Sequence, residues 1–468
     1  MIITQLIKDA MQEFEQIMKV FERQSDLSYL TAELANQFSR TLQQALSQAG
    51  RKAFQDFIES YDLADPNLYH QNRKFRWKQY SVKQFLTPYG VIPIRRSLYQ
   101  ADCGGRAYIP LDHFWGMEGE FVLPDVREAI AFSMAHLTAK ETEQFFRKCH
   151  WFTPSATAIQ HVVARIGETI EKHREELYRN VNQEETVSPE AVSVAVSMDG
   201  VNVLLNEPGV GRGRPAERPG KNPAGEKTCY KNAMVGSFTV YGNVPKAKKT
   251  PERLDSRYIA RMPEDQALTF KRDFEREVES LEKRLPPSIT KILLFDGQRS
   301  LWNYVNEDTR YDAYERLIDF YHTSEHLSKA AELLFGKGTA AANQWYDKYY
   351  TKLLEKDEAV ASILCSIEYY HKQKHWGKQK RKLLHQEISY FRRNGWLMNY
   401  ADFRRQGLPI SSGPVEAACK SIVKTRLCRS GMRWSREGGQ RILHLRAFAK
   451  SGRWDNFWRH YLKLKNAG

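Results

Sequence analysis

The sequence predicts an α/β protein in which a mixed sheet follows a helical N-terminal region. Apolar residues first recur at helical spacing, and from about residue 190 their period changes to that of strands. Residues 192–205 and 232–244 have the alternation of strands, and the helix-like stretch 270–284 leads to the apolar strand 289–295. Strands followed by a helix and a further strand indicate a mixed α/β layer.

Residues 1–70 form the first predicted region, and they read as helices. Their apolar residues recur three or four positions apart: Leu6, Met11, Phe14, Ile17, Met18, Phe21, Leu42, Leu46, Phe54 and Ile58. None of these side chains carries chemistry, so packing is the preferred interpretation. Dimerisation and contact with a DNA backbone are the alternatives.

Residues 71–120 contain a predicted basic β-hairpin. Strands 81–86 and 91–99 flank Thr87-Pro88-Tyr89-Gly90, in which Pro and Gly are typical of a turn. Five basic residues surround it: Arg76, Lys78, Lys83, Arg95 and Arg96. Such a ribbon can lie against phosphates, and its charges can equally do no more than solvate an exposed face.

Residues 121–186 have the pattern of a helix-turn-helix unit. Pro124 opens a first helix, and Thr138-Ala139-Lys140-Glu141 is a capping box that opens a second. Thr153-Pro154 starts a third helix over 155–168, with Pro at the first helical position. If the third helix reads DNA, polar residues face the groove and an arginine lies near a phosphate: Ser155, Thr157, Gln160, His161 and Arg165. Three-helix packing without DNA contact is the alternative.

Residues 187–324 contain the predicted sheet. The connection 211–227 is rich in Gly, Pro and charge, which predicts a long mobile loop that either cradles a DNA backbone or is only solvated. A third short strand lies near 258–260. After a helix over 298–305, a fifth strand is predicted over 314–322.

The remaining segments are predicted to be helical or basic. Residues 325–400 are rich in Leu, Ala, Lys and Tyr and carry no strand signal. Residues 401–450 hold a helix that begins near Pro414, and residues 451–468 form a basic tail with Trp.

The charge of the chain favours a polyanion as partner. Its 468 residues carry 71 Lys and Arg against 56 Asp and Glu, a net charge of +15. A basic protein without such a partner is the alternative.

The composition also bears on the compartment. Six scattered cysteines form no Cys-x-x-Cys pair, which argues against a zinc knuckle or a disulfide framework and fits a reducing compartment. The N-terminus lacks a signal-peptide pattern, and no apolar run approaches the roughly 18 residues of a membrane span. We therefore expect a cytoplasmic, nucleoid-associated protein with no membrane contact.

Three carboxylates occupy settings from which they can converge on one point. Asp199 follows the alternating stretch 192–198, and Asp296 follows the apolar run 292–295. Glu416 lies in the first turn of the helix that begins near Pro414. Hard oxygen ligands of this kind suit Mg²⁺, and two such ions can stabilise both the attacking and the leaving oxygen of a phosphodiester displacement. In a basic chain, this chemistry points to nucleic acid.

Each acid also has a simpler interpretation. An Asp that ends a strand in a turn is commoner than a ligand, although Asp199 and Asp296 repeat the same Asp-Gly pattern. The helix dipole favours an anionic Glu416, yet a Glu-Lys pair one helical turn apart would need no function. The cluster of basic and aromatic residues that follows favours phosphate and base contacts: Lys420, Lys424, Arg426, Arg429, Arg433 and Trp434.

The order of these motifs resembles that of the DDE transposases of bacterial insertion sequences. Two Asp-Gly pairs, each after a strand, precede Gly-Pro-Val-Glu-Ala-Ala-Cys-Lys at 413–420. The run Cys-Arg-Ser-Gly-Met-Arg-Trp-Ser at 428–435 looks like the signature after the Glu in the Kra-type group. Asp319-Phe320-Tyr321-His322 matches the D-x-x-H motif of Mutator-like and related elements. The resemblance covers roughly residues 85–450, and the Glu block is its most specific part.

For the fold, the resemblance implies an RNase H-like catalytic domain in two parts. The first part is residues 187–324, and the second is 401–450 with the Glu helix. The helical stretch 325–400 lies where members of the family carry an insertion.

For function, the resemblance implies a transposase that binds double-stranded DNA at its element ends and at a target. Asp199, Asp296 and Glu416 would hold Mg²⁺, with Mn²⁺ as a substitute, and His322 would be an accessory residue unless it only packs beside Asp319. Water would cleave a strand, and the freed 3′-OH would attack the target. Pairing two ends implies a homodimer or higher oligomer on DNA. A nuclease or resolvase of the same fold, and a transposase-derived DNA-binding protein without catalysis, are the alternatives.

Overall fold

The chain forms two compact units. The computed structural model describes residues 3–63, 65–102, 104–105, 107–206, 230–373 and 376–466. The first unit comprises residues 1–169 with 461–468, and the second comprises residues 170–460. The segment 211–227, predicted to be a long loop, lies outside the described residues.

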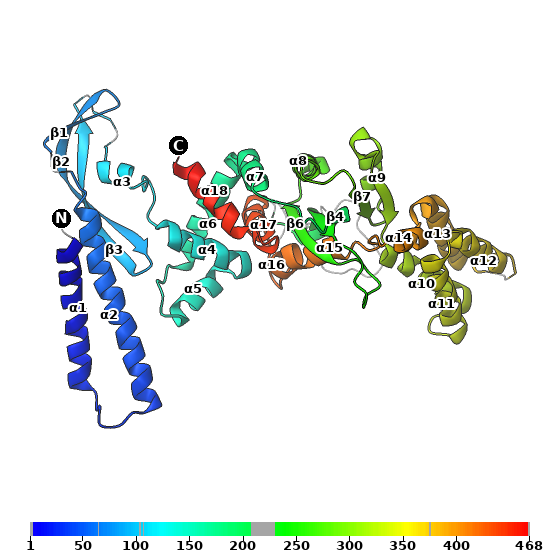
Figure 1. Cartoon of the computed structure of the whole chain (residues 1–468), viewed down its shortest axis with the longest axis horizontal. Coiled ribbons are helices and arrows are strands. Elements are labelled where there is room, and N and C mark those ends of the chain that lie inside the picture. Colours follow the sequence, from blue (N-terminus) through cyan, green and yellow to red (C-terminus); the bar gives the residue numbers. More distant parts are fainter. Residues whose placement is uncertain are drawn as a thin grey trace. The chain divides into compact units, whose positions relative to one another are not determined.

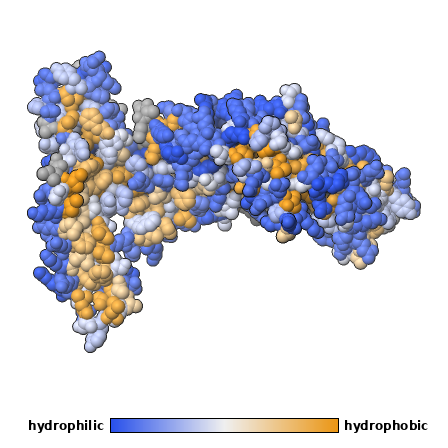
Figure 2. Space-filling view, in the orientation of Figure 1, coloured by the Kyte–Doolittle hydropathy of each residue, from blue (hydrophilic) through white to orange (hydrophobic). Residues whose placement is uncertain are grey.

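Two long helices begin the first unit (Figure 1). α1 (Ile3–Gln24) and α2 (Ala32–Glu59) pack against each other, and Thr31 caps α2 by accepting the Leu34 amide. Helices were expected here from the spacing of the apolar residues. Figure 2 shows apolar surface along this pair, and Ile3, Ile7 and Met11 are among its exposed side chains.

An antiparallel sheet of three strands follows in the order β1-β2-β3. The strands are β1 (Asn67–His70), β2 (Arg73–Thr87) and β3 (Gly90–Ala101), so the predicted hairpin is present and longer than expected. Its basic residues do not all reach solvent. Arg96 is buried and paired with Asp112 at 2.5 Å, on the short helix α3 (Pro110–Phe114), whereas Arg95 is exposed.

Three helices with the predicted starts complete the described core of the first unit. They are α4 (Pro124–His136), α5 (Ala139–Lys148) and α6 (Ala156–Lys172). The capping box before α5 is confirmed, because Thr138 accepts the Glu141 amide and Glu141 accepts the Thr138 amide. Ser155 accepts the Ala158 amide and so lies before the first turn of α6. The prediction that Pro154 occupies the first helical position is therefore wrong, because Pro154 precedes this capping residue.

The second unit is built on a mixed sheet of five strands in the order β6-β5-β4-β7-β8. β4 pairs with β5 and β5 with β6 in antiparallel fashion, whereas β4 pairs with β7 and β7 with β8 in parallel. The prediction of a mixed α/β layer is confirmed. The strands are β4 (Ser193–Leu204), β5 (Tyr230–Tyr241), β6 (Arg253–Arg261), β7 (Thr290–Phe295) and β8 (Glu315–Ile318).

Helices cover this sheet and extend from it. α8 packs against β5 and β6, and α17 packs against β6, while α10 packs against α11 and α13. Phe238, Phe274 and Leu293 belong to the apolar core that joins sheet and helices. The helices are α7 (Arg174–Gln183), α8 (Leu268–Glu282), α9 (Arg299–Asn306), α10 (Phe320–Phe335), α11 (Ala340–Glu355), α12 (Ala359–Gln373), α13 (Lys378–Asn394), α14 (Tyr400–Arg405), α15 (Gly413–Ala418), α16 (Thr425–Leu427), α17 (Arg436–Lys450) and α18 (Trp454–Asn466).

The predicted fifth strand over 314–322 is wrong in its second half. β8 ends at Ile318, and α10 begins at Phe320. Asp319 causes the change, because its carboxylate accepts the His322 amide and caps α10. His322 therefore lies in the first turn of a helix.

No helix in the described part of the chain is both long and apolar enough to cross a membrane.

Candidate acidic site

Three aspartates form a row across the parallel strands of the second unit. The register of β4 with β7, continued by three residues, sets Asp199 beside Asp296. The register of β7 with β8, continued by one residue, sets Asp296 beside Asp319, and the Asp319 amide donates to the Phe295 carbonyl at 2.7 Å. The three carboxylates line one hollow, and Asp199 and Asp319 both act electrostatically on Asp296.

Glu416 reaches the same place from α15. This helix begins at Gly413, carries Pro414 in its first turn and packs against β4 and β5. Acids from both sources line one hollow of about 460 Å³. Its lining consists of Met198, Asp199, Asp296, Asp319, His322, Ser412, Gly413, Val415, Glu416, Ala417, Cys419, Lys420 and Lys424. The structure thus brings together the three acids singled out in the sequence.

The helix that carries Glu416 changes its winding after one turn. α15 continues into a π-helix over Cys419–Lys424, which is followed by α16. Five residues of this stretch are buried and form its apolar face: Val415, Ala418, Cys419, Ile422 and Val423. π-turns within helices are frequent at functional sites.

Asp319 is the fully buried member of the row, and hydrogen bonds hold it in place. One carboxylate oxygen accepts the His322 amide at 2.7 Å. The other accepts the amide and the hydroxyl of Ser412, at 2.5 and 2.9 Å. The Ser412 hydroxyl also lies 3.4 Å from a Glu416 oxygen. Asp319 is therefore connected through Ser412 to Glu416.

Asp199 and Asp296 are partly buried and have fewer donors. Asp199 accepts the Gly200 amide at 2.6 Å, and the Cys419 thiol lies 3.4 Å from its second oxygen. Asp296 accepts the Gln298 amide at 2.9 Å.

Burial, and then the neighbouring carboxylates, favour the neutral forms of Asp296 and Glu416. Burial raises the pKa of Asp296, and Asp199 and Asp319 raise it further, against the opposing effects of the Gln298 amide and His322. Burial likewise raises the pKa of Glu416; Asp319 and Asp199 add to the shift, and the Ser412 hydrogen bond opposes it. A cation in the hollow would relieve this repulsion.

The donor set fits a hard divalent cation in its chemistry. Carboxylate oxygens are the ligands that Mg²⁺ takes from proteins. Among the residues that the structure describes, no three His, Cys, Asp or Glu side chains are grouped closely enough to hold an ion. The acids therefore line a common hollow without forming a closed ligand cluster.

His322 lines the hollow beside Gly297. A Cβ atom at Gly297 would come within 3.2 Å of the His322 Nε2 atom and 3.1 Å of the Tyr390 ring, so the Asp-Gly pair leaves room for these two rings. His322 also contacts the His326 ring edge to face, with centroids 5.0 Å apart.

The basic residues after Glu416 differ in their surroundings. Lys420 and Lys424 are exposed and line the hollow. Arg426 is 2% exposed and lies over the Trp434 ring at 5.1 Å, while the Trp434 indole donates to the Leu427 carbonyl, so both have packing roles. Arg429, by contrast, is half-buried, and its Nε atom donates to the Thr425 carbonyl. Arg433 is also half-buried.

The residues predicted to read DNA from the third helix of the first unit lie on its surface. Ser155, Thr157 and Gln160 are exposed on or beside α6. Arg165 is also exposed, but it pairs with the buried Glu120 at 3.0 Å. DNA contact by this helix stays a prediction.

Three residues of the hollow had no role in the sequence interpretation of the acidic site. Asp319 was considered only as part of the D-x-x-H motif and as a partner of His322. Its place directly after Leu317 and Ile318, like that of Asp296 after an apolar run, is the signal that could have added it to the acids. Ser412 could have been noticed as the residue before Gly413-Pro414 at a helix start. For Cys419, burial first and then Asp199 raise the pKa of the thiol, which keeps it protonated.

No model of a known protein family matches this chain, and no curated protein matches it.

Proposed function

We propose that this protein is a DNA transposase of the DDE type, with an RNase H-like catalytic domain. The observation that carries the proposal is the row of Asp199, Asp296 and Asp319 in a hollow that Glu416 also lines. The net charge of +15 and the resemblance of the Glu block to insertion-sequence transposases support it. The mixed five-stranded sheet is compatible with the RNase H-like fold.

The proposed roles follow from position and charge. Asp199, Asp296 and Glu416 would hold Mg²⁺, which when bound would activate water and stabilise the leaving oxygen of a phosphodiester. Asp319 is fully buried and satisfied by Ser412 and the His322 amide, so it would position Glu416 rather than bind the ion. His322 would border the reacting phosphate as an accessory group.

Basic residues at the hollow would hold the DNA backbone. Lys420 and Lys424 are exposed at its edge, and Arg429 and Arg433 follow nearby in the sequence. Side chains of this kind fix the position of a duplex without reading its sequence. Joining two element ends to one target would need at least two copies of the chain, working on DNA in the cytoplasm.

Cleavage of labelled DNA that carries the element ends tests the proposal. Asp296→Ala should lower Mg²⁺-dependent strand cleavage by more than about 100-fold, because changing even the partners of metal ligands costs 10–100-fold. DNA binding should be unchanged. Asp347→Ala is the matched control, since Asp347 is an exposed carboxylate on α11 and should retain full cleavage.

Two results would contradict the proposal in different ways. Strong Mg²⁺-dependent cleavage by Asp296→Ala would remove the acidic hollow as the active site. Cleavage by the wild type whose 3′ ends never join a second duplex would indicate a nuclease or resolvase instead.

A further inference from the structure

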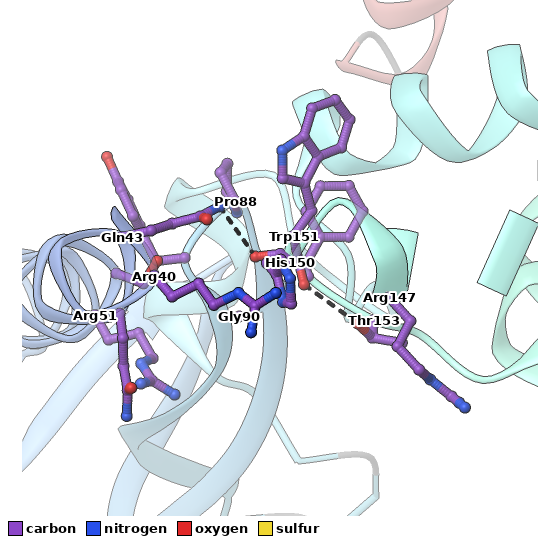
Figure 3. Close-up of a pocket in the computed structure, with 13 residues that line it drawn as sticks. Arg40, Gln43, Arg51, Pro88, Gly90, Arg147, His150, Trp151 and Thr153 are labelled. Carbon is purple, nitrogen blue, oxygen red and sulfur yellow. Dashed lines mark hydrogen bonds between the residues drawn. The ribbon is translucent and has the colours of Figure 1, made fainter. Parts of the chain in front are cut away.

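A second hollow, of about 530 Å³, lies in the first unit and contains none of the acids described above. Three segments far apart in the sequence form it: α2, the turn between β2 and β3, and the connection between α5 and α6. Figure 3 shows Arg40, Gln43 and Arg51 on one side of it, opposite His150 and Trp151.

The lining is basic and contains no Asp or Glu. It includes three arginines and a histidine, Arg40, Arg51, Arg147 and His150. Arg147 is paired with Glu143 at 2.8 Å. Neither Arg40 nor Arg51 has an ion pair or hydrogen-bond partner among the described residues, and Arg40 extends toward His150 in Figure 3. Two uncompensated guanidinium groups at one hollow attract an anion.

Aromatic rings complete the hollow. Trp151 is 52% exposed and Tyr89 is 43% exposed, so both present ring surface to solvent. Trp151 is supported from within, because its ring contacts Phe146 at 6.1 Å and the nearly parallel Phe152 at 6.4 Å. A supported, exposed indole beside arginines is the arrangement on which nucleobases stack.

The backbone that presents Trp151 is in an unusual conformation. His150 has a φ of 55°, in the left-handed region that favours glycine. It follows α5, where the His150 amide donates to the Arg147 carbonyl and the Trp151 amide donates to the Phe146 carbonyl. Glycine is the usual residue at this position of a helix end. The Gln43 side-chain amide, on α2, donates a hydrogen bond to the His150 carbonyl at 3.3 Å.

We propose that this hollow binds a DNA strand, with a phosphate between Arg40 and Arg51 and an adjacent base stacked on Trp151. His150 adopts a backbone conformation that costs less for Gly, and a contact between its side chain and a ligand would explain why His occupies the position. The choice of DNA as the ligand rests on the proposed function, whereas the anion and ring chemistry rests on the hollow itself. A site of this kind would hold unpaired or distorted DNA apart from the acidic hollow.

Binding of fluorescein-labelled single-stranded and duplex DNA, measured by anisotropy in EDTA at several salt concentrations, tests the proposal. The variant Arg40→Ala/Arg51→Ala should bind single-stranded DNA at least about tenfold more weakly. The dependence of log K on log salt should become less steep by about 0.7, because one phosphate contact to a single strand is lost. Arg73→Ala is the matched control, because Arg73 is exposed at the start of β2, roughly 45 Å along that strand from the turn at Thr87. It should leave both quantities near those of the wild type.

Two further variants separate stacking and strain from charge. Trp151→Ala should weaken binding of single-stranded DNA roughly 5- to 100-fold without changing the salt slope, and Trp151→Phe should restore most of the loss. His150→Gly suits the backbone, so it should keep the melting temperature of the wild type and still weaken binding. Circular dichroism and thermal melting establish that each variant is folded.

Equal DNA affinity of Arg40→Ala/Arg51→Ala and Arg73→Ala would overturn the proposal. The proposal would also be overturned if inorganic phosphate bound in the hollow, as detected by Trp151 fluorescence, and DNA did not displace the phosphate. If the wild type binds DNA through these residues and never cleaves it, the hollow stands and the transposase proposal falls. If Arg40→Ala/Arg51→Ala changes neither cleavage nor DNA binding, the proposal for the basic hollow is refuted and the transposase proposal is unaffected.

Discussion

At the scale of single residues, the repulsion within the acidic row has a measurable consequence. The pKa of Asp296 is raised above its ordinary value of 3.8 by burial and then by Asp199 and Asp319. A carboxyl whose pKa is raised by folding contributes stability below its unfolded pKa, and this contribution is lost as the pH rises through its folded pKa. Neutral pH without metal is therefore the condition in which Asp296 destabilises the fold.

We expect Asp296→Asn to melt at a higher temperature than the wild type at pH 7 in EDTA. The difference should shrink as the pH falls toward 4, because the wild-type carboxyl then becomes neutral as well. Added Mg²⁺ should raise the melting temperature of the wild type and not that of the variant. Thermal melts across this pH range check the prediction, and a gap that is constant with pH would refute it.

At the scale of elements, Asp319 joins three parts of the second unit. It follows β8, caps α10 and binds Ser412 immediately before α15. Asp319→Ala removes a cap and leaves buried donors unpaired, so we expect it to destabilise the fold by about 2–4 kcal/mol. Urea unfolding measures this loss.

Ser412→Ala separates the positioning role of Asp319 from its structural role. Ser412→Ala keeps the hydrogen bond from the Ser412 backbone amide to Asp319 and removes only the hydroxyl. We therefore expect the free energy of unfolding to fall by about 1 kcal/mol. The cleavage rate should fall by a larger factor than this loss of stability explains. If the variant is less stable but cleaves DNA at the wild-type rate, the Ser412 hydroxyl between Asp319 and Glu416 has no role in cleavage.

The elements that could be predicted from sequence were those with one dominant local signal. Alternation gave β4 and β5 approximate bounds, and the capping box at Thr138 gave the start of α5. The end of β8 could not be found in this way, because Asp319 lies between apolar and aromatic residues that continue the appearance of a strand. The π-helix after Ala418 also has no local signal in the sequence; in the structure it packs against β4 and α17.

More of the acidic hollow than of the basic hollow could be predicted from the sequence. Asp199, Asp296 and Glu416 could be found because each lies near a recognisable start or end of an element. Their convergence with Asp319 in one hollow depends on the packing of β4, β7, β8 and α15, which no local pattern shows. The basic hollow combines α2, a β-turn and a helix end, and no periodicity connects such distant segments. The sequence predicted the basic hairpin and its turn, but not that α2 and the connection between α5 and α6 lie beside that turn.

At the scale of the whole molecule, the two hollows lie in separate compact units and share no residue. Effects of substitutions that have no common partners usually add within about 0.5 kcal/mol. We therefore expect the loss of DNA binding free energy in Arg40→Ala/Arg51→Ala to be the same with and without Asp296→Asn. Anisotropy titrations of the four proteins in EDTA give the double-mutant cycle directly. A coupling well above about 0.5 kcal/mol would mean that one bound DNA segment engages both hollows at once, and that they act as a single site.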